Sequence, residues 1–537
     1  MTGGARDNGM SASSGGKAYL VGGGIASLSA AVLLIRDAGL RGADIHILEE
    51  QAVAGGALDG SGNAGSGYVS RGGRMLTEET YSCLWDVLDG IPSLSDPARS
   101  VKQEVWEFNA RHRSNAHARL VNREHHVVDS SRLGFNFGDR TELVGFLARG
   151  EESLGALRID ECFSGHFLDS NFWTLWRTTF AFQNWHSAVE LRRYMLRFLQ
   201  EFPRIHTLAG VRRTQLNQYD SIVRPMEAWL RAQGVAFEFG VRIEDVEFEP
   251  ALHSRTIRAL LGSRGGEPLR YDVGEKDIAL ITIGSMTADA RQGDDEHAPK
   301  LVSDRRDGAW KLWQNIARKG RGFGRPSVFC RHVEQSKWES FTLTMRSPLL
   351  LKHIERLSGN EAGTGGLMTF KDSSWLLSIV VPHPPHFASQ PDDVFTLWGY
   401  GLFVDRKGDY VGKTMAQCGG KDILKELLHH LGCADLLEEM QRTSTVIPVM
   451  MPYITSEFAC RRPGDRPAVI PECAVNFAFL GQYVEIPEDV VFTVEYSVRS
   501  AMLAVYGLLG IDRAVPAIYR GVADPKVLAA GLRTLAA

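Results

Sequence analysis

A glycine-rich turn near the N-terminus has the residue types and spacing that bind a pyrophosphate. In Gly22-x-Gly24-x-x-Ser27, Gly22 permits the turn and Gly24 lets the backbone approach a phosphate. The helix that begins at Ile25 directs its free N–H groups and positive dipole end to the same point. Glu49, at the end of the next predicted strand, can accept hydrogen bonds from a ribose diol. The predicted nucleotide-binding residues of this unit are Gly22, Gly24, Ile25, Ala26, Ser27, Glu49 and Glu50.

Further glycines favour FAD over NAD as the nucleotide. Two turns, Gly55-Gly56 and residues 71–74 (RGGR), follow the acid, and Gly284 and Gly481 each close an apolar strand much later. This order is typical of flavoproteins with two dinucleotide-binding domains, and arginines can supply charge to the anionic parts of the cofactor. The further predicted FAD contacts are Gly55, Gly56, Arg71, Gly72, Gly73, Arg74, Val241, Gly284, Ser285 and Gly481.

The elements that must position these residues are a strand, a turn, a helix and a second strand within residues 17–50. The pattern predicts a buried strand that ends at Val21, a helix over residues 25–38 that Gly39 ends, and a strand over residues 44–48. The expected fold class is α/β. It combines a Rossmann-like FAD-binding domain, of the two-dinucleotide-binding-domain flavoprotein type, with a mixed α+β substrate domain and helical additions.

This interpretation divides the chain into five parts. Residues 1–16 form a Gly/Ser-rich flexible tail. The FAD-binding domain is discontinuous and takes residues 17–130, 221–300 and 470–510. An aromatic-rich helical insertion takes residues 131–220, and a substrate-binding domain takes residues 301–469. The C-terminal helical segment, residues 511–537, packs on the body or, alternatively, makes peripheral contact with a membrane.

The composition excludes several classes of protein. Hydrophobic residues make up 44% and charged residues 23% of the 537 residues, as in ordinary globular proteins, and the net charge of −4 argues against a nucleic-acid partner. Seven dispersed cysteines without a C-x-x-C pair predict reduced thiols, a cytoplasmic location and no metal site. No apolar run is long enough to span a bilayer, and the N-terminus lacks the apolar region of a signal peptide.

Several long stretches resemble the oleate hydratase family, also called myosin-cross-reactive antigens. They include GGGIASLSAA, LEEQAVAGGALDG, RGGRM, SNFWTLWRTTFAFQNWHSAVELRRYMLRF, LNQYDSIVRPM and NFAFLGQYVEIPEDVVFTVEYSVRSA, and the resemblance covers about residues 17–510. It implies an FAD-binding enzyme that adds water across the cis-9 double bond of oleic acid to give 10-hydroxystearic acid. The implied FAD is reduced, undergoes no net redox change and mainly shapes the site.

The resemblance also assigns roles to single residues. It implies that Tyr219, in the N-Q-Y segment, is the general acid that protonates the alkene. The family's proposed water-activating glutamate is replaced here by Met75, whose thioether cannot accept a proton at neutral pH. If residues 75–79 begin a helix, Glu78 and Glu79 lie on the same face as Met75, and one of them replaces that carboxylate. The alternatives are that both only favour the helix dipole, or that backbone groups hold the water.

Other residues are weaker candidates. Tyr453, Thr455 and Ser456 are polar groups that could hold the fatty acid carboxylate, and the aromatics between Phe172 and Trp185 form either core or an acyl tunnel. His186 could serve as a proton shuttle, but it is expected to be a hydrogen-bonded helix residue. Residues 408–414 resemble a P-loop but are one residue short, so they are interpreted as a loop. The family's usual homodimer uses a longer N-terminal arm than the tail that precedes Lys17, so we do not expect that arm-mediated dimer.

Two other functions compete with hydration. A flavin oxidoreductase that acts on an apolar lipid would use the same nucleotide turns. A lipid-binding antigen without catalysis would agree with the family's older name, but it gives no reason for a flavin site. The aromatic-rich helices and the NQYDS segment favour the hydratase.

Overall fold

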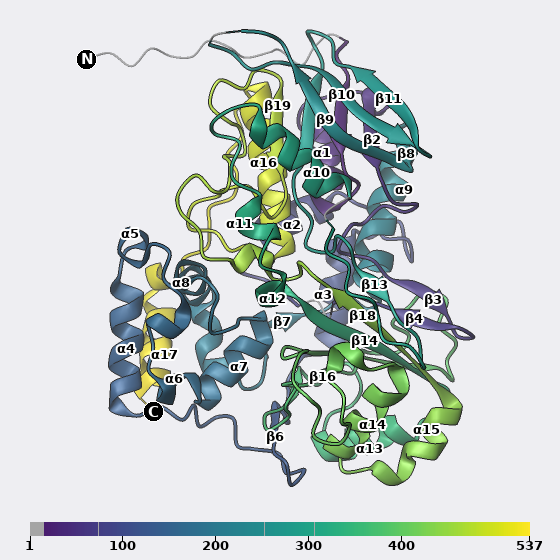
Figure 1. Ribbon diagram of the computed structural model, residues 1–537, viewed down its shortest axis with the longest axis vertical. Helices are drawn as coiled ribbons and strands as arrows, with labels where there is room; N and C mark the ends of the chain where they lie inside the picture. The colour runs from purple at the N-terminus through teal and green to yellow at the C-terminus, as the bar shows by residue number, and fades with distance from the viewer. Residues whose placement is uncertain (1–14, 73–74, 252, 305–306, 537) are drawn as a thin grey trace.

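The computed structural model describes residues 15–72, 75–251, 253–304 and 307–536, and its first layer is a parallel five-stranded sheet (Figure 1). The strand order is β19-β12-β1-β2-β8, and every neighbouring pair is parallel. The strands are β1 (Ala18–Val21), β2 (Ile45–Glu49), β8 (Ala236–Phe239), β12 (Ile278–Thr282) and β19 (Phe477–Leu480). This confirms the predicted Rossmann-like sheet, and its strands come from widely separated parts of the chain.

Two helices distant in the sequence pack together on this sheet. α1 (Ile25–Arg36) contacts β12, and α16 (Val494–Leu509) contacts β19, while the two helices also contact each other. Both helices carry apolar or small residues on most sides, which suits helices that are buried all round. α2 (Ser82–Asp89) and α9 (Arg224–Ala232) complete the cover, α2 on α16 and α9 on α1.

A small antiparallel sheet lies beside the parallel one. Its order is β11-β10-β9, formed by β9 (Val241–Phe248), β10 (Ile257–Arg264) and β11 (Glu267–Asp272). α10 (Gly308–Arg318) packs on β9, and β9 also contacts β2. These contacts bring the start of β9 and the start of α10 close to the carboxyl end of β2, where ligands bind in open parallel sheets.

The third sheet has seven strands in the order β13-β18-β14-β17-β16-β15-β6, antiparallel except for the β15–β6 pair. One face of β14 packs Phe341, Leu343 and Met345 into a core covered by α13, α14 and α15. The other face of the sheet carries Trp338 and Tyr400, whose ring centroids lie 4.8 Å apart. The strands are β6 (Leu120–Val121), β13 (Arg291–Gln292), β14 (Trp338–Met345), β15 (Met368–Phe370), β16 (Ser378–Val380), β17 (Phe395–Gly401) and β18 (Ser444–Met451).

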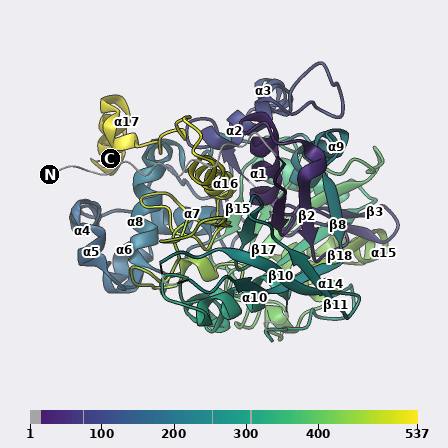
Figure 2. The same cartoon turned by 90° about the horizontal axis from the view of Figure 1, so that it is seen from above.

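A helical lobe stands to one side of the sheets, and Figures 1 and 2 both place the C-terminal helix within it. α8 (Ala188–Arg197) continues into a 3₁₀ stretch, Leu199–Arg204, and α17 (Pro525–Ala536) packs directly on that stretch. The other helices of the lobe are α4 (Phe137–Ala148), α5 (Glu151–Leu154), α6 (Gly165–Leu168) and α7 (Asn171–Phe180).

The helix considered for residues 75–79 does not form. β5 (Leu76–Thr77) pairs antiparallel with β7 (Val211–Arg212), so a strand from a distant part of the chain decides the local conformation. Among the described residues, no helix has the length and apolar content that a membrane span requires. The remaining elements are β3 (Ser61–Asn63), β4 (Gly67–Val69), α3 (Val101–Arg111), α11 (Ser327–Cys330), α12 (Val333–Ser336), α13 (Leu349–Ser358), α14 (Gly420–His430) and α15 (Leu437–Thr443).

Candidate functional site

Two glycine turns meet at the carboxyl ends of the parallel strands. The Gly55 N–H donates to the Gly23 carbonyl oxygen at 2.9 Å, and Gly24 and Gly55 form an isolated β-bridge. A side chain at Gly56 is disfavoured for two reasons. Its Cβ would lie 3.2 Å from the Gly24 Cα, and the φ of +58° is a conformation that favours glycine. The turns therefore present bare backbone to the cleft in front of them.

That cleft, named here the glycine cleft, has features that suit a phosphate. α1 begins after Gly24 without a side-chain cap, so its first N–H groups remain available at the positive end of the helix dipole. The Glu49 carboxylate accepts hydrogen bonds from the N–H groups of Gly23, at 2.5 Å, and Gln51, at 2.7 Å. Burial raises the pKa of Glu49, although these backbone hydrogen bonds oppose the shift.

The glycine cleft brings together most of the residues predicted to bind the nucleotide. Ser27 is an exception, because it is fully buried with its Oγ 3.3 Å from Thr282 Oγ1. Gly72 lines two other cavities instead, and Gly73 and Arg74 lie outside the described residues. The predicted residues that line the cleft are Gly22, Gly24, Ile25, Ala26, Glu49, Glu50, Gly55, Gly56, Arg71, Val241, Gly284, Ser285 and Gly481.

Arg71 links the Gly55-Gly56 turn to the segment that follows Gly284 rather than standing free. Its guanidinium pairs with Asp59 at 2.8 Å and donates to the Gly56 carbonyl oxygen at 2.8 Å and the Thr287 carbonyl oxygen at 3.3 Å. Arg71 lines both the glycine cleft and a second cavity, so it stands on the wall between them.

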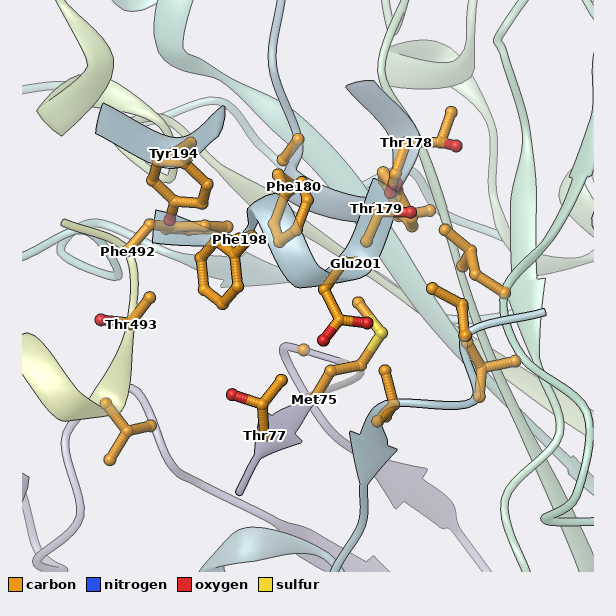
Figure 3. Close-up of a pocket in the computed structure, with 18 of the residues that line it drawn as sticks. Met75, Thr77, Thr178, Thr179, Phe180, Tyr194, Phe198, Glu201, Phe492 and Thr493 are labelled. Carbon is orange, nitrogen blue, oxygen red and sulfur yellow. The ribbon is translucent and has the colours of Figure 1, made fainter. Parts of the chain in front are cut away.

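The second cavity, named here the apolar pocket, lies between the helical lobe and the seven-stranded sheet (Figure 3). Phe180, Phe198, Trp338, Trp398 and Phe492 supply aromatic walls. Phe492 and the next two residues also line the glycine cleft, so the two cavities share a wall. Most of the other predicted tunnel aromatics, such as Trp173 and Trp176, are fully buried in the core.

Three residues of one helical face point into the apolar pocket: Tyr194, Phe198 and Glu201, spaced i, i+4 and i+7 along α8 and its 3₁₀ extension (Figure 3). The Tyr194 hydroxyl donates to the Val491 carbonyl oxygen, one residue before the shared wall. Burial raises the pKa of Tyr194 well above its usual 10, so the phenol is neutral. Tyr194 and Glu201 could not be recognised as pocket residues from the sequence, because their helical spacing does not indicate which face of the helix meets a cavity.

Met75 lines the apolar pocket, but Glu78 and Glu79 do not. Both glutamates are exposed: Glu78 pairs with Arg212 at 3.1 Å, and Glu79 pairs with Arg204 at 3.1 Å. The alternative in which one of them faces the same site as Met75 is therefore wrong, because residues 76–77 form a strand and not a helical turn.

Tyr219 lies outside the apolar pocket. It begins a short π-helical turn, Tyr219–Val223, and its ring Cδ2 is 3.4 Å from the place a Cβ on Gly55 would occupy. Tyr219 lines neither the apolar pocket nor the glycine cleft, and burial raises its pKa. The phenols that do line the apolar pocket are those of Tyr81, Tyr194 and Tyr400.

A third cavity, named here the arginine cavity, adjoins the apolar pocket through shared residues Gly72, Val380 and Trp398. Arg213 lines it, and the Nε and Nη2 atoms of Arg213 are buried without a hydrogen-bond partner among the described residues. Burial lowers the pKa of Arg213 to about 10, which leaves the group cationic at neutral pH. Burial and the Arg213 charge lower the pKa of the nearby His386 to about 4, so that imidazole is neutral.

The three polar residues expected at the substrate carboxylate have internal partners instead. Tyr453 Oη contacts Asp289 Oδ2 at 3.2 Å, Thr455 Oγ1 donates to the Ser336 carbonyl oxygen at 3.0 Å, and Ser456 Oγ lies 2.6 Å from Tyr483 Oη. All three are buried and line neither the apolar pocket nor the arginine cavity. Only their neighbour Ile454 reaches the apolar pocket, so this expectation is corrected.

Two features that resemble chemical motifs have structural roles. His186 Nδ1 accepts the Gln183 N–H at 3.0 Å, and burial lowers the pKa of His186 to about 3. In the loop over residues 408–414, the N–H groups of residues 409–411 all donate to the carboxylate of Glu426. That loop therefore holds a protein carboxylate rather than a phosphate.

Most of the chain is similar in sequence to known proteins. The MCRA family model matches residues 15–506. An oleate hydratase of Streptococcus pyogenes serotype M49 (strain NZ131) is 37% identical over 522 residues, which cover 95% of this chain and 88% of that protein. A linoleate hydratase of Lactiplantibacillus plantarum is 34% identical over 536 residues, which cover 92% of this chain and 94% of that protein.

Solved structures with much lower identity share the fold. A putrescine oxidase bound to putrescine superimposes with a TM-score of 0.52 at 11% identity, covering 92% of this chain and 99% of that chain. At this identity the likeness concerns the arrangement of sheets and helices alone.

Proposed function

Because the chain belongs to the MCRA family, we propose that it is a fatty acid hydratase that adds water to the cis-9 double bond of oleic acid, giving 10-hydroxystearic acid. The observation that carries this proposal is the set of three adjoining cavities. The glycine cleft suits a dinucleotide, the apolar pocket suits an acyl chain, and the arginine cavity suits a carboxylate. An unsaturated fatty acid and water are then the substrates.

FAD is the nucleotide that we assign to the glycine cleft. The uncapped start of α1 and the bare backbone of Gly24 would hold the pyrophosphate, and Glu49 would accept the ribose hydroxyls. Bound in its reduced state, FAD would shape the reaction site without a net redox change. Arg71 and Phe492, which line both cavities, would then separate cofactor from substrate.

The fatty acid carboxylate would bind in the arginine cavity. Two buried guanidinium nitrogens without a hydrogen-bond partner among the described residues are costly unless a ligand supplies the missing acceptor. A carboxylate is the acceptor that matches the paired N–H geometry of arginine. The neutral imidazole of His386 lies near Arg213 and adds a polar wall that does not repel the guanidinium cation. The acyl chain would extend from the arginine cavity past Trp398 into the apolar pocket.

We assign the proton donor to Tyr194 rather than to Tyr219. Tyr194 lines the apolar pocket close to the wall shared with the glycine cleft, whereas Tyr219 does not reach the pocket. A neutral phenol can protonate an alkene only where the developing positive charge is stabilised and water is scarce. The faces of Phe180, Phe198 and Trp398 can supply that stabilisation, because aromatic rings attract cations.

One experiment tests the hydratase against its main alternative, an FAD-dependent oxidoreductase that acts on an apolar lipid. The purified protein is incubated with FAD, a reductant, oleic acid and ¹⁸O-labelled water, and the products are analysed by mass spectrometry. We expect a 10-hydroxy acid that carries solvent oxygen. A desaturated product, or an oxygenated product without solvent label, would instead support the oxidoreductase.

A further inference from the structure

Glu201 is the only carboxylate among the described residues that line the apolar pocket. Figure 3 shows its carboxylate pointing into the pocket beside the side chain of Met75, with Thr77 on the same side. The Glu201 side chain is only 6% exposed. It comes from the 3₁₀ stretch Leu199–Arg204, so a different segment of the chain delivers a carboxylate to the place where Met75 offers only a thioether.

The surrounding residues fix the position of this carboxylate. Arg204 donates to both of its oxygens, from Nε to Oε2 at 2.9 Å and from Nη2 to Oε1 at 2.6 Å. Gly210 leaves the space for this pair, because a Cβ there would lie 2.5 Å from Glu201 Oε2 and from the Arg204 guanidinium carbon. The Arg204 guanidinium also pairs with the exposed carboxylate of Glu79, and this second ion pair helps to fix its position.

We propose that Glu201 is the base that removes the proton from the attacking water. This inference rests on the proposed hydratase function. At one alkene carbon, the π electrons form a C–H bond with the phenolic proton of Tyr194. At the other, the water oxygen forms the C–O bond while its O–H bond breaks and the proton passes to Glu201. Transfer of that proton back to the Tyr194 phenolate then restores both groups, and no electrons are gained or lost.

The electrostatic surroundings suit a base that must be ionised near neutral pH yet accept a proton. Burial raises the pKa of Glu201, while the hydrogen bonds and charge of Arg204 oppose that shift. Glu79 raises the pKa of Glu201 further, and Arg212, from β7, lowers it. Tyr194, which faces the same pocket, is a neutral phenol. A general base is most effective when its pKa lies close to the working pH.

The alternative is that Glu201 only forms an i,i+3 ion pair with Arg204, which would be structural. Glu201→Gln separates the two, because glutamine keeps the shape and the acceptor oxygen but cannot take the proton. General acid–base catalysis contributes roughly 10²- to 10⁴-fold. We therefore expect kcat for oleate hydration to fall by at least about 10²-fold, with KM and FAD content unchanged. Glu78→Gln is the matched control: it breaks an exposed glutamate–arginine pair outside the pocket and should keep the full rate.

Two rescue measurements separate a chemical role from a structural one. In Glu201→Gln, the additional change Met75→Glu places a carboxylate on the neighbouring side chain and should restore part of kcat. In Glu201→Gly, added formate should raise the rate in a concentration-dependent way. The pH profile gives a third readout, because the acidic limb of wild-type kcat should disappear in Glu201→Gln.

Three results would overturn the inference while leaving the hydratase intact: a Glu201→Gln enzyme with wild-type kcat, an unchanged acidic limb in its pH profile, or lost activity that neither rescue restores. Failure of the proposed function is recognised separately. In that case the wild-type and Glu78→Gln proteins would also form no hydroxy acid, although they bind FAD.

Discussion

The sharpest prediction concerns Arg213, because one substitution should weaken substrate binding and strengthen the fold. Arg213→Met keeps much of the length of the side chain and removes the charge. Without ligand, the buried Nε and Nη2 atoms of Arg213 have no hydrogen-bond partner among the described residues. With fatty acid bound, they would face its carboxylate.

Both magnitudes follow from the structure. Burial lowers the pKa of Arg213 from the ordinary value of arginine to about 10, and this shift corresponds to a loss of about 3 kcal/mol of folding free energy while the group is charged at neutral pH. Because the folded state has the lower pKa, this cost is full below pH 10 and declines as the pH rises from there towards the ordinary pKa of arginine in the unfolded chain. For binding, two charge-assisted hydrogen bonds contribute roughly 1.5–3 kcal/mol each. Their loss should raise the Kd for oleate by roughly 10²- to 10⁴-fold.

The assay compares oleate with its methyl ester, which keeps the acyl chain and lacks the charge. Wild-type protein should bind oleate far more tightly than methyl oleate, whereas Arg213→Met should bind the two almost equally. The ligand-free variant should also show a higher Tm than wild type at pH 7. The reasoning is refuted if Arg213→Met weakens both ligands by the same factor, or if it still prefers oleate as strongly as wild type does.

Three further predictions test other parts of the account. Tyr194→Phe should lower kcat for oleate hydration by at least about 10²-fold, whereas Tyr219→Phe should stay within a fewfold of wild type; the reverse ranking in steady-state assays would return the acid role to Tyr219. Gly24→Ala adds a methyl group that lies 3.9 Å from the Gly56 Cα, so the Tm of the apoprotein should not change. Because Gly24 lines the glycine cleft, the affinity for FAD, measured by flavin fluorescence, should fall at least about tenfold. Equal affinity would argue against a pyrophosphate at this turn. Burial raises the pKa of Glu339 well above its usual value, and both of its oxygens lack a hydrogen-bond partner among the described residues. The contribution of Glu339 to folding stability should therefore be most favourable below pH 4.5 and should decline as the pH rises. In denaturant titrations, Glu339→Leu should raise the free energy of unfolding by about 1–3 kcal/mol at pH 8 and by less at pH 5, and an equal change at both pH values would contradict this.

The sequence was informative where a local backbone requirement fixes the residue type. Gly22 and Gly56 have positive φ values, and Gly24 lets two backbones approach, so these turns could be recognised one by one. Glu49 followed from its place at the end of a predicted strand. These residues lie at the centre of the glycine cleft, and the strand–turn–helix–strand pattern of residues 17–50 predicted the Rossmann-like sheet that positions them.

The sequence was less informative where distant segments decide the outcome. Residues 76–77 form a strand only because Val211–Arg212 lies beside them, and nothing local to Glu78 and Glu79 indicates this partner. Tyr194 and Glu201 share a helical face, but only the packing of the lobe against the seven-stranded sheet makes that face a pocket wall. Arg213 lies in a polar stretch without periodicity, and the burial of its Nε and Nη2 atoms depends on strands more than 100 residues away.

The central claim is that this chain hydrates an unsaturated fatty acid without a net redox change, and double labelling tests it most directly. Oleic acid is incubated with the FAD-loaded, reduced protein in D₂¹⁸O, and the absorption spectrum of the flavin is followed during turnover. The account predicts a single product with one solvent deuterium on C9 and one solvent oxygen on C10, while the flavin spectrum stays that of the reduced form. A product without both labels, or flavin oxidation in proportion to product formed, would contradict it.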